Sequence, residues 1–181
     1  MFAIISRNKL TYVILLIYAI LLVWWAKIFF TGVKETDENY LFGFLYPLIA
    51  LIGSIAGFIS SKKWGGFKSL IGRGIIFFSL GLFGLWFGQT VWSYYNLIAR
   101  VPVPYPSIAD IGYFAIIPLY GYGMYCFGKA SGIKFSLKSI GGKIIVVLIP
   151  IIMVAISYFL FLRNLAPDFS DPLKTFLDFG Y

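Results

Sequence analysis

The feature that most constrains the fold of this chain is a succession of long apolar stretches, each bounded by charged residues or by Gly, Pro and Ser. A helix needs roughly 20 apolar residues to cross the hydrocarbon core of a bilayer. Stretches of about this length lie at residues 10–30, 40–60, 74–98, 111–127 and 144–162. We therefore expect an all-α, polytopic bundle of transmembrane helices with five spans, built as a single integral membrane domain over residues 1–181.

The composition also indicates a chain surrounded by membrane lipid. Sixty per cent of the residues are hydrophobic and 12% are charged, and the mean hydropathy is +0.89. A soluble domain of 181 residues must keep its outer faces polar and cannot hide this much apolar surface. Membrane lipid is therefore the expected partner. Despite the net charge of +8 we expect no nucleic-acid partner, because the lysines flank the apolar stretches and form no single basic face.

Several residue types that carry chemistry are missing. The chain has no His and a single Cys, Cys126, and these two residue types supply most metal sites and many general bases. It also lacks a P-loop, a Ser/His/Asp set and a His/Glu zinc motif. No charged residue falls in the middle third of any apolar stretch, where a charge usually marks a transport path. We expect no enzymatic activity, no metal and no cofactor.

Basic and acidic residues lie in alternating connections between the apolar stretches, which predicts that they lie on opposite sides of the membrane. Ten of the fifteen Lys and Arg residues lie before the first stretch, between the second and third, or between the fourth and fifth. All seven acidic residues lie in the other connections or in the tail. An excess of Lys and Arg marks cytoplasmic loops. The sequence thus predicts a multi-pass protein of the cell (inner) membrane with a cytoplasmic N-terminus, and with the third connection and the C-terminal tail on the external side.

The third connection is the most specific segment. From Arg100 to Tyr113 it reads Arg-Val-Pro-Val-Pro-Tyr-Pro-Ser-Ile-Ala-Asp-Ile-Gly-Tyr. Three prolines in five residues exclude regular helix. Ser107 and Asp110 have the spacing of a capping box and predict that the next helix begins here. Arg100 can pair with Asp110 or reach lipid headgroups.

We hypothesise that an outward-facing ligand pocket lies between this connection and the end of the third span. Polar residues at i, i+3 and i+7 share one helical face there and form its wall. The candidate ligand-binding residues are Gln89, Trp92, Asn96, Pro104, Tyr105, Ser107, Asp110 and Tyr113. Two other interpretations remain open. The polar face can serve hydrogen bonds between helices, with the aromatic residues as an interfacial belt. Asp110 can act as a helix cap alone.

Two GxxxG pairs indicate close helix packing. Gly53 and Gly57 lie in the second span, and Gly84 and Gly88 lie in the third. Small residues let helix backbones approach each other in lipid. The motifs fit either a homo-oligomer formed through these faces or packing of the spans within one bundle.

The tail repeats a pattern found in the third connection. Thr175 to Tyr181 and Ser107 to Tyr113 both fit [ST]-x-x-D-x-G-Y, with Asp178 in the place of Asp110. Because the first copy opens a span, the second predicts the start of a sixth. We expect a chain truncated at its C-terminus; the alternative is a chain that ends in a short interfacial helix.

Trp92, Tyr95, the segment from Val101 to Tyr113 and the following Pro118-Leu resemble a bacterial family of N-terminal membrane regions found ahead of PAS, GGDEF, EAL or histidine-kinase modules. In that family a Pro-[Tyr/Phe]-Pro-Ser-x-Ala-Asp-x-x-Tyr segment recurs between spans. The tail segment from Phe176 to Tyr181 is similar to a second family segment. The resemblance implies a membrane sensory module for a cytoplasmic output domain, which this chain does not contain.

From these observations we expect a non-catalytic sensory or input module of a prokaryotic signal-transduction protein. One alternative is a subunit or half of an oligomeric transporter or channel, to which the repeated motif and the GxxxG faces are suited. A second alternative is a small assembly subunit of a larger membrane complex.

Overall fold

The computed structural model describes residues 9–132, 140–162 and 170–180, and these residues are helical apart from their connections and contain no strand. The expected all-α fold is confirmed. The helices are α2 (Lys9–Thr31), α3 (Asp37–Leu45), α4 (Leu48–Lys63), α5 (Leu70–Ser93), α6 (Ile108–Ala130), α7 (Ile140–Ser157) and α9 (Pro172–Gly180). A 3₁₀ turn η1 (Gly66–Lys68) precedes α5, and π-helical turns η2 (Tyr94–Ala99) and η3 (Tyr158–Leu162) extend α5 and α7.

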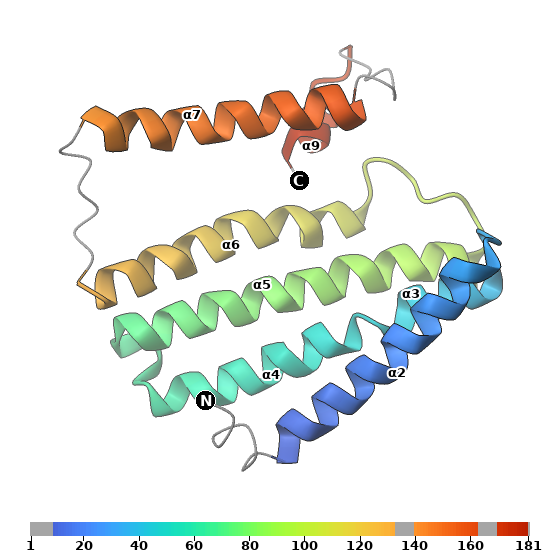
Figure 1. Cartoon of the computed structure of the whole chain (residues 1–181), viewed down its shortest axis with the longest axis horizontal. Helices are drawn as coiled ribbons and strands as arrows, with labels where there is room; N and C mark the ends of the chain where they lie inside the picture. The colour runs from blue at the N-terminus through green and yellow to red at the C-terminus, as the bar shows by residue number, and fades with distance from the viewer. Residues whose placement is uncertain (1–8, 133–139, 163–169, 181) are drawn as a thin grey trace.

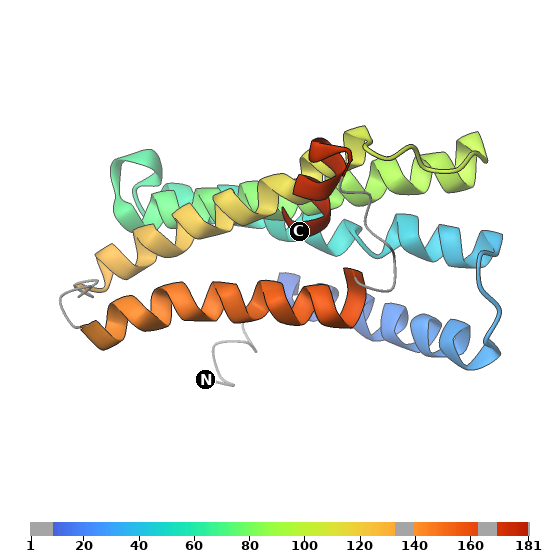
Figure 2. The same cartoon turned by 90° about the horizontal axis from the view of Figure 1, so that it is seen from above.

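Helix α5 is the centre of the bundle, with α4 on one side and α6 on the other (Figure 1). Helix α2 runs obliquely and meets α3 near one end, and α7 runs beside α6 at a greater distance (Figures 1 and 2). We call the end that carries Lys62, Lys63, Lys68 and Lys129 the lysine end. The opposite end, where residues 100–107 join η2 to α6, is the loop end.

Three stretches are long and apolar enough to cross a membrane: Thr11–Thr31, Asp37–Lys63 and Leu70–Ala99. They correspond to the first three expected spans and support a membrane location. The fourth and fifth expected spans form helices α6 and α7 but are not among these three. Helix α6 is long, with 23 residues, but it is rich in Gly and Tyr, which are less apolar than Leu or Ile. The described part of α7 contains a shorter apolar run, Leu148–Leu160.

The second expected span consists of two successive helices that meet at Pro47. Helix α3 begins at the N-cap Thr36, whose side chain accepts a hydrogen bond from the backbone of Asn39. It stops before Pro47, because the proline ring has no N–H to donate to the preceding turn. Helix α4 then starts at Leu48. Pro118 and Pro150, in contrast, lie inside continuous helices.

The predicted packing glycines contact neighbouring helices of the same chain. A Cβ added to Gly84 would lie 2.9 Å from the carbonyl oxygen of Gly112, and one added to Gly88 would lie 2.9 Å from that of Ala109, so α5 and α6 touch through their backbones. Gly53 and Gly57 also face α5, where they meet the side chains of Leu82 and Ser79. The GxxxG pairs therefore pack α4 and α6 against α5 within the chain.

Candidate functional site

The loop end brings α5, the proline-rich connection and α6 together. Turn η2 ends at Arg100, which has a left-handed backbone (φ 52°) and directs the chain away from the helix axis. Residues 101–106 follow without helix, as their prolines require. Helix α6 then begins at the N-cap Ser107.

The predicted capping box at the start of α6 is confirmed. Ser107 is the N-cap and Asp110 is the third helical residue. The Asp110 carboxylate accepts a hydrogen bond from the backbone N–H of Ser107. Asp110 is 8% exposed, so this carboxylate is held in a fixed place beside the loop. Capping explains its position, and the same position makes it part of a cavity wall.

A cavity of about 430 Å³ opens at this junction. Its lining includes seven of the eight candidate ligand-binding residues, together with Val103 and Ala109: Gln89, Trp92, Pro104, Tyr105, Ser107, Asp110 and Tyr113. We call it the loop-end cavity. Across it, the Tyr113 hydroxyl donates to Gln89 Oε1 at 2.7 Å and links α6 to α5.

Asn96 is the candidate residue that lies elsewhere. It lines a neighbouring cavity of about 350 Å³ with Glu35, Asp37, Tyr40 and Arg100. The expected spacing assumed 3.6 residues per turn, but residues 94–99 form a π-helical turn with more residues per turn, which rotates Asn96 away from the face of Gln89 and Trp92. Its amide donates to the Trp92 carbonyl oxygen at 2.9 Å.

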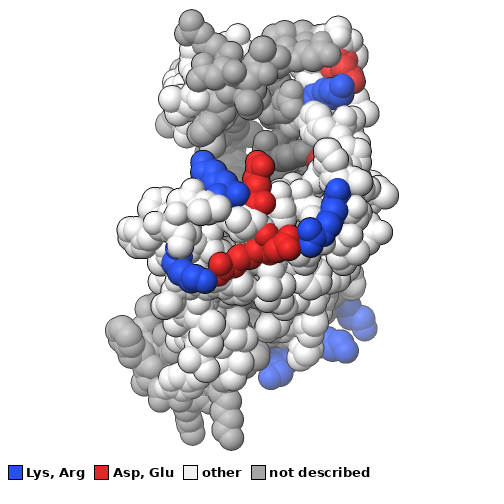
Figure 3. Space-filling model, turned by 90° about the vertical axis from the view of Figure 1, so that its right-hand side faces the viewer, with Lys and Arg blue, Asp and Glu red and all other residues white. Residues whose placement is uncertain are grey.

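Arg100 pairs with Asp37, at 3.0 Å between Nη2 and Oδ2, a partner that the sequence pattern did not indicate. Nearby, Glu38 Oε1 accepts from Lys27 Nζ at 2.6 Å and from Trp24 Nε1 at 2.9 Å. Figure 3 shows acidic side chains beside basic ones over this end of the molecule. Both ion pairs are well exposed, so water and salt screen them and each contributes little to stability.

Helix α9 packs against the other side of the same wall. The ring centroids of Phe114 and Phe176 are 5.2 Å apart, Leu177 is 7% exposed, and the Tyr105 hydroxyl donates to the Lys174 carbonyl oxygen at 3.4 Å. A cavity of about 410 Å³ between α9 and α6 shares Ser107 and Asp110 with the loop-end cavity. Sequence reasoning missed this contact, because no local pattern indicates which element α9 meets.

The repeated motif does not have the same structural role twice. Asp171 begins α9, since its Oδ1 accepts from the backbone N–H of Leu173 at 3.0 Å and of Lys174 at 3.2 Å. Thr175 therefore lies inside α9, whereas its counterpart Ser107 is an N-cap. The expectation that Thr175 opens a helix is wrong. The side chain of Asp178 and all of Tyr181 lie outside what the structure describes.

The chemistry available in the loop-end cavity is hydrogen bonding. An amide, two phenols, a serine hydroxyl, a carboxylate and an indole line the cavity together with Pro, Val and Ala. Pockets with a few fixed polar groups on an apolar lining are typical of small-molecule sites. Among the described residues, no group of three or more His, Cys, Asp and Glu is placed to hold a metal ion.

No protein-family model, no curated protein and no solved structure matches this chain.

Proposed function

We propose that this chain is the membrane-embedded input module of a signal-transduction protein, without catalytic activity of its own, and that the loop-end cavity binds its signal. One observation carries the proposal. Seven residues from α5, the connection and α6, singled out by residue type and spacing, line a single cavity. Its volume of about 430 Å³ suits a small polar molecule.

The proposal includes five membrane crossings, with α6 and α7 as the fourth and fifth. At 1.5 Å per residue, the 23 residues of α6 extend about 34 Å, enough for a hydrocarbon core of about 30 Å. Helix α6 also packs along α5, which is apolar enough to span. The basic residues of the lysine end favour a cytoplasmic position for that end. The N-terminus is then cytoplasmic, and the loop-end cavity faces the exterior of the inner membrane.

The route from the cavity to an output starts at α9. Ser107 and Asp110 stand between the loop-end cavity and α9, and Tyr105 bonds to the α9 backbone. A molecule that displaces Tyr105 changes how α9 rests on α6. A cytoplasmic effector, tethered or separate, would receive this change through the neighbouring helices.

The test is a binding screen on the purified chain in nanodiscs. The probes are amino acids, sugars and dicarboxylic acids, and the readouts are thermal unfolding and tryptophan fluorescence. Val103→Trp fills the cavity from its rim, and Ile108→Trp adds the same bulk at a position that is 57% exposed and does not line it. We expect a probe that stabilises the native chain and Ile108→Trp, but not Val103→Trp.

Two results would contradict the proposal. One is that no probe stabilises the native chain, or that every stabilising probe acts equally on Val103→Trp. The other is that the chain, reconstituted in liposomes, carries a bound probe across the membrane. That result would favour the transporter alternative.

A further inference from the structure

A larger cavity lies away from the loop-end cavity, between α2 and the α4–α5 pair. Its volume is about 520 Å³. Tyr18, Leu22 and Trp25 of α2 form one wall, and Ala50, Gly53 and Leu82 face them from α4 and α5. The lining side chains are aliphatic or aromatic, and none carries a charge. We call this cavity the α2 groove.

The α2 groove exists because α2 leans away from α4. Helix α2 meets α3 near the loop end and crosses the bundle obliquely, so it does not close onto α4 (Figure 1). None of the residues in its most apolar window is buried in the chain. Because this window is apolar enough to span a membrane, the groove opens sideways toward hydrocarbon.

The size of the groove decides between a lipid chain and another helix. A helix with its side chains is about 10 Å across, so an eight-residue length occupies about 900 Å³. The groove holds about 520 Å³ over the eight residues from Tyr18 to Trp25. This length is about 12 Å along the helix axis, against about 15 Å for the hydrocarbon of one leaflet. A flexible single chain fits these dimensions and a helix does not.

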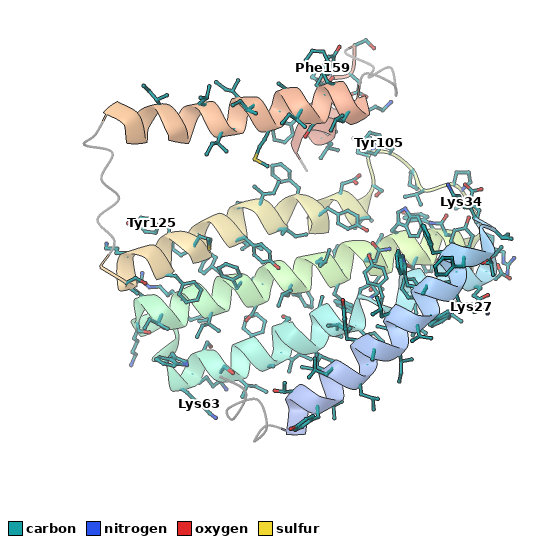
Figure 4. The ribbon with its side chains drawn as sticks, in the orientation of Figure 1. Lys27, Lys34, Lys63, Tyr105, Tyr125 and Phe159 are labelled. Atoms are coloured by element: carbon teal, nitrogen blue, oxygen red, sulfur yellow. The ribbon has the colours of Figure 1, made fainter. Side chains whose placement is uncertain are left out.

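The position of Trp25 gives the direction of the chain. Trp25 lies at the end of the groove nearest the loop end, and it stacks on Phe29 at 5.3 Å between ring centroids. Lys27 and Lys34, labelled in Figure 4, lie beyond it at the same end of the molecule. Trp and Lys are enriched where a helix meets the headgroup region. Tyr18 then marks the deeper end.

We propose that the α2 groove binds one acyl chain of a membrane phospholipid, which enters beside Trp25 and runs toward Tyr18. This site is separate from the loop-end cavity, since no residue lines both. One lipid would then be held in a defined place against α4 and α5. The rest of α2 would contact bulk lipid molecules that exchange freely.

The test is native mass spectrometry of the detergent-purified chain, after incubation with palmitoyl-oleoyl phosphatidylcholine or phosphatidylglycerol. Leu22→Trp and, from the opposite wall, Ile49→Trp fill the groove. Val23→Trp is the matched control, because Val23 is 71% exposed and does not line the groove. We expect one retained phospholipid on the native chain and on Val23→Trp. Each groove-filling variant should weaken retention about tenfold or more, which corresponds to about 1.4 kcal/mol.

Thermal unfolding provides the second measurement. Added phospholipid should raise the melting temperature of the native chain and Val23→Trp more than that of either groove-filling variant. Equal lipid retention by all four proteins would mean non-specific annular binding and would overturn the proposal. Retention of no lipid would also overturn the proposal. So would a lipid-free dimer that is lost in Leu22→Trp, because it would show that a second copy of the chain occupies the groove.

Discussion

At the scale of single residues, the contact between α5 and α6 depends on glycines whose backbones touch. A Cβ added to Gly112 would lie 2.5 Å from the carbonyl oxygen of Gly84 and 2.6 Å from the amide nitrogen of Gly88. Both are backbone atoms, so the helices would have to separate. We expect Gly112→Ala to lower the free energy of unfolding by about 2–3 kcal/mol, measured by unfolding in mixed micelles with SDS.

Gly121 is the control for this prediction. It lies in the same helix, is exposed, and has no atom within 4 Å of an added Cβ. Gly121→Ala should leave stability unchanged or raise it by up to about 1 kcal/mol, because Ala is the better helix former. Equal losses in the two variants would show that α6 does not pack on α5 through Gly112.

The hydrogen bond across the loop-end cavity is a second prediction at this scale. Tyr113→Phe removes the hydroxyl that donates to Gln89 Oε1 at 2.7 Å and leaves the ring in place. We expect a loss of about 1 kcal/mol in the same unfolding assay. Tyr122→Phe is the comparison, since the Tyr122 ring packs on Phe77 at 4.3 Å between centroids and the residue is 38% exposed. A larger loss in Tyr122→Phe would contradict the described contact.

The site residues were predictable where local rules decide their position. The Ser107–Asp110 cap depends on residues three apart, and the prolines around Tyr105 act on their own backbone. Asn96 was misplaced because η2 departs from the α-helical period that the sequence pattern assumed. The partner of Arg100 could not be predicted from nearby residues, because Asp37 is 63 residues away in sequence.

At the scale of elements, α9 should be held to α6 by a small apolar contact. Leu177 is 7% exposed, whereas Leu173 in the same helix is 56% exposed. We expect Leu177→Ala to speed hydrogen exchange of the backbone amides of residues 173–177 by about tenfold, the effect of losing about 1.4 kcal/mol of local stability. Leu173→Ala should have a smaller effect, and faster exchange in Leu173→Ala than in Leu177→Ala would contradict the docking of α9.

The elements themselves were predicted with uneven success. The first span was expected at residues 10–30 and is observed as Lys9–Thr31, since its apolar run is long and uninterrupted. The second was predicted at residues 40–60 and lies within the apolar stretch Asp37–Lys63. Within this stretch α3 gives way to α4 at Pro47, because the proline has no N–H to continue the hydrogen bonds of α3. Helix α9 starts at Pro172, earlier than the repeated motif suggested, because Asp171 supplies the cap.

At the scale of the whole molecule, small residues are inside and large apolar residues are outside. The largest fully buried side chains among the described residues are Pro47, Ser54, Ser93 and Cys126. Many Leu, Ile, Phe and Tyr side chains are more than one-third exposed. Helices in lipid pack through small residues, since lipid gives no reason to bury large apolar ones. The composition predicted this solvent, but not which faces of the helices meet.

Side-specific cysteine labelling tests whether five crossings place the loop-end cavity on the external side. In a Cys126→Ala background, single cysteines replace Lys68, Pro104, Ser131 or Ser170, all of which are exposed. A membrane-impermeant maleimide is added to intact cells and to inverted vesicles. We predict that Lys68→Cys and Ser131→Cys are labelled only from the cytoplasmic side, and Pro104→Cys and Ser170→Cys only from the external side. Labelling of Pro104→Cys from the cytoplasm would contradict an external loop-end cavity, and labelling of two consecutive positions from the same side would contradict a membrane crossing between them.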